Sequence, residues 1–154
     1  MNRILLLAVI SVLAMGSCDE QEAKDSVSRK PNLLAVNDID QYNPPAPGSL
    51  VCADSMTVTD DPLNHFNFSV KIKTNEYSNK GTYSIEAAFG PNNANGMFTM
   101  PKGGGHLKPM LQKSKEPYTY IIGFEYQHKF YEYYRVTGSK WTIEIKNIKA
   151  YTFQ

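Results

Sequence analysis

Hydrophobic and polar residues alternate along much of the chain after residue 49, which is the pattern of β-strands with one buried face. Between residues 66 and 73, polar side chains separate the apolar Phe66, Phe68, Val70 and Ile72. Turn-forming residues follow at 78–81, and the alternation resumes over residues 83–89. These two segments together predict a β-hairpin.

Glycine, proline and asparagine interrupt the alternation in the middle of the chain. We expect a loop over residues 90–96, a short apolar return over 97–100 and a glycine-rich turn over 101–105. Pro109 lies in the middle of residues 106–113, so we expect this segment to be irregular.

Aromatic residues concentrate in the C-terminal third at strand spacing. Tyr118, Tyr120, Ile122, Phe124 and Tyr126 share one parity, residues 130–136 form a second aromatic run, and Trp141, Ile143 and Ile145 share a parity with Tyr151 and Phe153. Such segments, with turns at intervals of roughly eight to twelve residues, are typical of antiparallel sandwiches. We predict an all-β domain, an antiparallel β-sandwich or open barrel of about seven to eight strands, with helices short or absent.

The first eighteen residues have a different pattern. A positively charged start at Asn2 and Arg3 precedes an apolar run over residues 4–13, small residues and Cys18. The run of about ten residues is shorter than the roughly 20 needed to span a bilayer. The segment resembles a bacterial lipoprotein signal peptide with its lipobox. That resemblance implies cleavage before Cys18 and lipid on the Cys18 sulfur and amine, a firm anchor of two or more chains. The alternative is a buried N-terminal helix.

Three regions are therefore predicted: a signal peptide over residues 1–17, a lipidated cysteine with an extended tether over 18–48, and a β-sandwich domain over 49–154. The tether is polar and ends in a proline-rich spacer at 43–48. Its apolar exception, residues 33–36, is expected to dock as a short strand on the domain edge; contact with a partner is the alternative.

Short motifs near the anchor bear on location. The acidic residues 19–22 resemble a surface-export signal of some diderm bacteria, although an aspartate directly after the lipidated cysteine resembles an inner-membrane retention signal in others. A plain charged linker is the third interpretation. Residues 25–27 (Asp25, Ser26, Val27) and 54–56 (Asp54, Ser55, Met56) resemble an O-glycosylation motif of gut-type diderms. We favour an outer-membrane lipoprotein, periplasmic or surface-exposed.

Net charge and cysteine content limit the possible partners and the possible roles of Cys52. Without residues 1–17 the chain has 154 − 17 = 137 residues, and loss of Arg3 lowers Lys+Arg from 16 to 15 against 15 Asp+Glu. A net charge of zero argues against nucleic acid as a partner. With Cys18 acylated, Cys52 has no partner within the chain, so it is either a buried small hydrophobe or an exposed thiol.

No motif for catalysis is evident. His65, His106 and His128 lack a repeating ligand spacing, and residues 102–105 lack the Lys-Ser/Thr of a phosphate-binding loop. No serine lies in a nucleophile-elbow context. We therefore predict no catalytic residues, no metal site and no cofactor, and a binding or assembly role is favoured over an envelope enzyme.

The binding partner is expected to be another envelope protein, with a surface glycan as the alternative. Residues 100–103, 120–124 and 133–135 resemble, in order, the loop, hydrophobic strand and aromatic-arginine segment of the outer-membrane lipoprotein of type VI secretion complexes. That family is a small β-sandwich whose loop binds an inner-membrane partner. If Phe130 and Tyr134 point inward, alternation turns Tyr131, Tyr133 and Arg135 outward, and these three are the predicted contact residues. The alternative is that both faces of this strand are covered.

Overall fold

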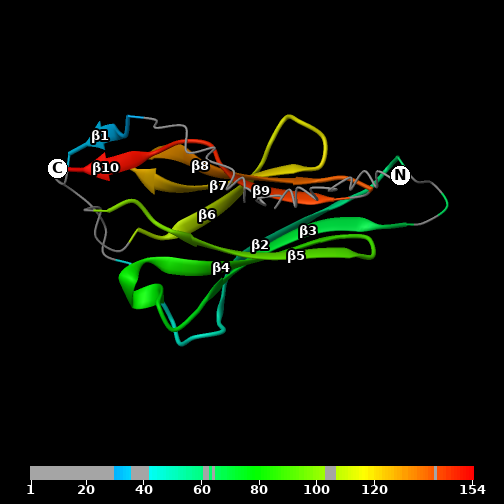
Figure 1. The fold of residues 1–154 in the computed structure, drawn as a ribbon, viewed down its shortest axis with the longest axis horizontal. Coiled ribbons are helices and arrows are strands. Elements are labelled where there is room, and N and C mark those ends of the chain that lie inside the picture. Colours follow the sequence, from blue (N-terminus) through cyan, green and yellow to red (C-terminus); the bar gives the residue numbers. More distant parts are fainter. Residues whose placement is uncertain (1–29, 36–41, 61–62, 64, 103–106, 141) are drawn as a thin grey trace, which may run out of the picture.

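The computed structural model describes residues 30–35, 42–60, 63, 65–102, 107–140 and 142–154, and two four-stranded antiparallel sheets dominate it (Figure 1). The first sheet has the order β2 (Leu50–Thr57), β3 (Asn67–Thr74), β4 (Thr82–Phe89) and β5 (Asn92–Thr99). The second has the order β6 (Pro109–Lys113), β7 (Thr119–Tyr126), β8 (Lys129–Gly138) and β9 (Ile143–Asn147). The predicted all-β sandwich is confirmed.

The predicted hairpin over residues 66–89 is confirmed as β3 and β4. Phe68, Val70 and Ile72 are fully buried, whereas the intervening side chains of β3 point away from the core. A single 3-10 turn at Ser78–Lys80 joins the two strands. It is the one helical turn among the described residues, which agrees with the expectation of short or absent helices.

Two segments predicted to be irregular are strands. Residues 92–96 belong to β5, because Gly90, with φ of 56°, and Pro91 form a two-residue turn that pairs Phe89 with Asn92. The asparagines are tolerated because β5 is an edge strand with one face open to solvent. Pro109 begins β6, also an edge strand, where the missing N–H of proline costs no ladder hydrogen bond.

The short strand predicted in the tether is also confirmed. β1 (Asn32–Leu34) pairs in parallel with β10 (Tyr151–Phe153), and the Gln154 N–H donates to the Leu34 carbonyl at 2.8 Å. Both strands lie at one end of the sandwich, together with the C-terminus (Figure 1). Val36, the last residue of the predicted strand, lies outside the described residues.

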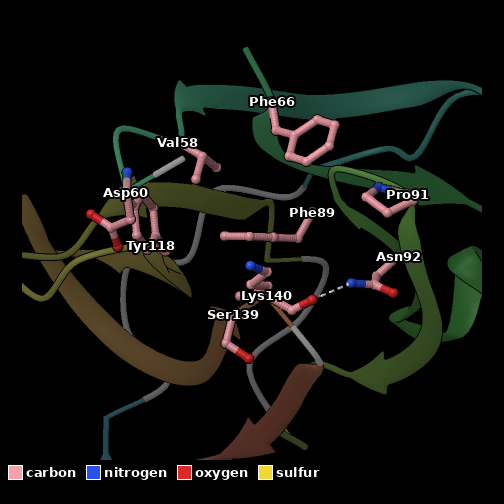
Figure 2. A pocket seen from close by; sticks show the side chains of 10 residues that line it. Val58, Asp60, Phe66, Phe89, Pro91, Asn92, Tyr118, Ser139 and Lys140 are labelled. Atoms are coloured by element: carbon pink, nitrogen blue, oxygen red, sulfur yellow. Dashed lines mark hydrogen bonds between the residues drawn. The ribbon is translucent and has the colours of Figure 1, made fainter. Parts of the chain in front are cut away.

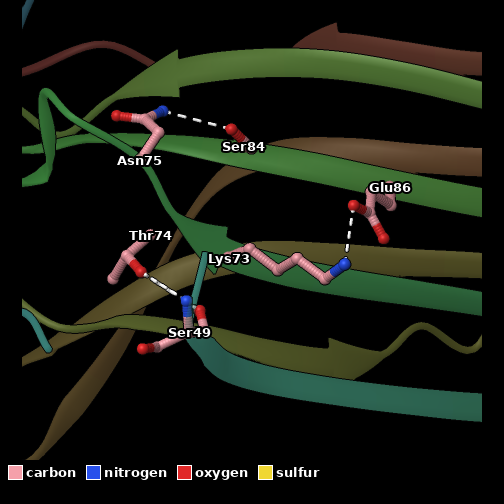
Figure 3. A network of polar contacts seen from close by, with 6 residues as sticks. All are labelled: Ser49, Lys73, Thr74, Asn75, Ser84 and Glu86. Atoms are coloured by element: carbon pink, nitrogen blue, oxygen red, sulfur yellow. Dashed lines mark hydrogen bonds and ion pairs between the residues drawn. The ribbon is translucent and has the colours of Figure 1, made fainter. Parts of the chain in front are cut away.

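The end of the proline-rich spacer is fastened to β3 by the buried Thr74. The Thr74 hydroxyl donates to the Ala46 carbonyl at 2.6 Å. It also accepts from the Ser49 N–H at 2.9 Å (Figure 3). Nearby, the Lys73 ammonium pairs with Glu86 at 2.8 Å, and the Asn75 amide donates to Ser84 at 3.1 Å (Figure 3). The Thr74 bonds anchor the end of the spacer to the first sheet.

The core lies between the two sheets and is mainly aromatic. Phe68 of β3 and Tyr120 of β7 join the sheets, with ring centroids 5.3 Å apart. The absence of a side chain at Gly138 of β8 leaves room for these rings. A Cβ there would lie 2.5 Å from the Phe89 ring and 2.9 Å from the Phe68 ring. Phe124, fully buried, packs against Tyr151 and Phe153 of β10.

Candidate functional site

An open cleft of about 480 Å³ lies between the two sheets, at the ends of β4 and β8 and the start of β7 (Figure 2). Described residues after β2, before β3, between β4 and β5, before β7 and after β8 meet there. Its apolar lining consists of Val58, Phe66, Phe89, Pro91, Tyr118 and Gly138. Its polar lining consists of Asp60, Asn92, Ser139 and Lys140.

Tyr118 forms one wall and is held from both ends. Its backbone has φ of 46°, which is uncommon for a bulky residue. Its hydroxyl accepts from the N–H groups of Thr59 at 2.9 Å and Asp60 at 3.2 Å, and its ring meets Phe89 edge-on at 5.4 Å. These contacts fix Thr59 and Asp60 against the start of β7 in the second sheet, so this wall of the cleft is preformed.

The opposite side of the cleft is tied by Asn92. Its side-chain amide donates to the Lys140 carbonyl at 2.9 Å, which joins β5 to the β8–β9 connection (Figure 2). The Ser139 hydroxyl is engaged with Thr142, accepting from its N–H and donating to its carbonyl, each at 3.2 Å. Six of the ten lining residues are apolar or aromatic, so the cleft is suited to binding an apolar group.

A β-bulge overturns the predicted orientation of Tyr131 and Tyr133. Ile122 pairs with Tyr134 and Gly123 with Glu132, so Tyr133 is an extra residue that shifts the alternation along β8. Tyr131 stacks on the buried Phe124 with ring centroids 5.5 Å apart, and the Tyr133 hydroxyl donates to the Thr99 carbonyl of the other sheet. Both tyrosines therefore pack on the core and do not point outward.

Phe130 and Arg135 take the outer face of the second sheet. Phe130 was predicted to point inward, but it pairs with the exposed Glu125 and its ring lies over Gly123. Arg135 does point outward, as predicted; its side chain is 41% exposed and pairs with Glu116 at 3.2 Å. The three predicted contact residues thus do not share one surface.

Cys52 is partly buried, so it is nearer to the buried small hydrophobe than to the exposed thiol of its two alternatives. It packs against the core, and its Sγ lies 3.8 Å from the Pro109 carbonyl oxygen. Burial raises the pKa of its thiol to about 11. At neutral pH the thiol is therefore protonated and a poor nucleophile.

The remaining candidates are spread over the surface. His65 and His128 are exposed, and no three His, Cys, Asp or Glu side chains of the described residues cluster as a metal site would need. Ser55 is exposed on β2, while its neighbour Asp54 pairs with Lys113 at 3.5 Å. Cys18, residues 25–27, His106 and residues 103–105 lie outside the described residues.

Sequence reasoning missed the cleft. The available signal was the position of Phe66, Phe89 and Tyr118, each of which lies at or beside the end of an alternating segment and next to turn residues. The pairing of sheets that brings these three strand ends together has no local signature in the sequence.

Searches against protein families, curated proteins and solved structures found no match for this chain. Within the described part of the chain, no helix is long and apolar enough to cross a membrane.

Proposed function

We propose that this chain is a lipid-anchored cell-envelope protein with a non-enzymatic binding role, whose partner is another envelope protein. The anchor is lipid on Cys18, and the favoured location is the outer membrane. The observation that carries the binding role is the preformed aromatic cleft at the loop end of the sandwich. Clefts of this kind, mostly apolar with few polar groups, are typical binding sites.

The chemistry of the cleft favours a protein side chain as its occupant. Phe66, Phe89 and Tyr118 suit an aromatic or aliphatic anchor, the type of residue that dominates interface energies. The polar lining includes both an acidic residue, Asp60, and a basic one, Lys140. A polypeptide can match both signs next to an apolar anchor.

A glycan is the alternative occupant, and the tyrosines do not favour it. All ten tyrosines are described, and Tyr77 is the one exposed by more than a third, at 48%. Tyr77 lies beside the 3-10 turn that precedes β4, whereas the cleft is lined by Phe89 at the other end of β4. The stacking platform of several exposed tyrosines that a glycan module would need is not formed.

Replacing Cys18 by serine is expected to release the full-length protein from the membrane fraction, because the thiol is the site of the lipid. Fractionation and the mass of the N-terminal peptide measure the change. A serine variant that stays in the membrane with an unchanged N-terminal mass would contradict the anchor.

Pro91→Trp is expected to reduce recovery of the partner about tenfold, which corresponds to roughly 1.4 kcal/mol. Pro91 is exposed on the two-residue turn at the cleft mouth, so a tryptophan there covers the apolar lining. The measurement is copurification with the full-length lipidated chain after mild crosslinking.

Lys80→Trp is the matched control. Lys80 is exposed on the turn at the other end of β4, whose eight residues span about 26 Å. This variant is expected to retain the partner fully. Equal recovery with both variants would remove the cleft from the proposed interface.

A further inference from the structure

β5 is an edge strand whose outward backbone groups have no partner strand. The Gly90 N–H donates to the Asn67 carbonyl, and the Met100 N–H donates to the Gly81 carbonyl. In an antiparallel pair of strands, hydrogen-bonded and non-hydrogen-bonded residue pairs alternate, and these two bonds show which pairs are hydrogen-bonded. The backbone groups of the even-numbered residues of β5 therefore bond to β4. The N–H and C=O groups of Asn93, Asn95 and Met97 therefore point away from the sheet.

The other three edges carry features that obstruct strand addition. β2 has a register shift between Leu50 and Cys52, and β6 contains Pro109 and Lys113. β9 carries Glu144 and Lys146. β5 has no charged residue, no proline and a continuous register over eight residues, so it lacks the protection that edge strands normally have.

We propose that two copies of this chain associate through β5, antiparallel about a two-fold axis at Asn95. In this register Asn95 faces Asn95 of the second copy, and Asn93 faces Met97 of the second copy. Every outward N–H and C=O of the three residues then gains a partner across the interface. The side chains that meet are neutral, so no like charges oppose each other.

The neighbouring edge of the second sheet fits the same axis. A Cβ on Gly96 would lie 3.2 Å from Cδ1 of Ile145, so β9 lies beneath β5 close to the axis. Glu144 and Lys146 flank Ile145 and are both exposed. A two-fold axis near Ile145 brings Glu144 of one copy toward Lys146 of the other, and the charges are complementary. This self-complementarity favours a second copy over a foreign strand.

Charge exchange at Asn95 tests the proposal. Full-length chains carrying two different C-terminal tags are coexpressed, and copurification of one tag with the other is measured in mild detergent. Asn95→Lys in both copies, or Asn95→Glu in both copies, places like charges across the axis. Mixing one copy of each places opposite charges there, and copurification of the mixed pair is expected to exceed either like-charged pair about tenfold.

Glu86 faces Asn95 on β4, so folding of each variant is checked by thermal melting. A second variant, with Asn93→Lys and Met97→Glu in one chain, places opposite charges across the axis twice and is expected to raise copurification above the wild type. Failure of the wild-type copies to copurify, or equal copurification of like-charged and mixed pairs, would overturn the proposal.

Discussion

Phe124→Ala is expected to lower the free energy of unfolding by about 4 kcal/mol, within the range for aromatic side chains deleted from a core. Phe124 is fully buried, and its ring contacts Tyr131, Tyr133, Tyr151 and Phe153. Its loss leaves a cavity under β10, so the pairing of β1 with β10 should weaken as well. Chemical denaturation of the full chain measures the change.

A double-mutant cycle with Phe124 measures the contribution of the Tyr131 ring to the core. Tyr131→Ala alone is expected to cost about 2 kcal/mol, because the ring is partly buried and stacks on Phe124 with an interplanar angle of 5°. The double variant should cost about 1 kcal/mol less than the sum, as expected for an aromatic pair. Tyr77→Ala, at an exposed position, serves as the control and should change stability by about 0.5 kcal/mol or less. A similarly small effect at Tyr131 would restore the outward orientation predicted from the sequence.

Gly123→Ala is expected to lower the free energy of unfolding by about 3 kcal/mol, at the upper end for overpacked sites. A Cβ at this position would lie 2.2 Å from the backbone oxygen of Tyr131 and 2.6 Å from the Phe130 ring. Backbone on the partner strand cannot move aside without breaking the bulge. The bulge and the outer position of Phe130 thus depend on this glycine.

Gly96→Ala is the matched control for Gly123, because it also adds one methyl group to a strand. The nearest atom to the new Cβ would be Cδ1 of Ile145 at 3.2 Å, the end of a flexible side chain. Its effect should stay within about 1 kcal/mol, since alanine also relieves the entropic cost of glycine. Equal destabilisation by the two variants in thermal and chemical melts would contradict the bulge geometry.

The alternation of residues 66–72 and 83–89 predicted β3 and β4 because each strand buries one face only. The same rule failed for residues 92–96, where an edge strand open to solvent places little demand on composition. The prediction of an irregular segment around Pro109 failed for a related reason, since an edge strand can begin with proline. Composition identifies central strands better than edges for this physical reason.

The candidate site was harder to predict than the fold. One inserted residue, Tyr133, shifts the parity of β8, and nothing in the run of residues 130–136 marks where the insertion falls. The tyrosines placed outward by simple alternation therefore became core residues. The cleft depends on Phe66, Phe89 and Tyr118 meeting across two sheets, which requires the topology and not only the elements.

Site-specific photo-crosslinking in intact cells tests the binding cleft most directly. A diazirine-bearing lysine analogue replaces Asp60, which is exposed and lines the cleft, in the full-length lipidated chain. The same analogue at Lys80, on the turn at the other end of β4, serves as the control. We predict a discrete crosslinked envelope protein from position 60, lost when Pro91→Trp is added, and none from position 80. The same products from both positions, or a product at 60 that persists with Pro91→Trp, would contradict the cleft as the binding site.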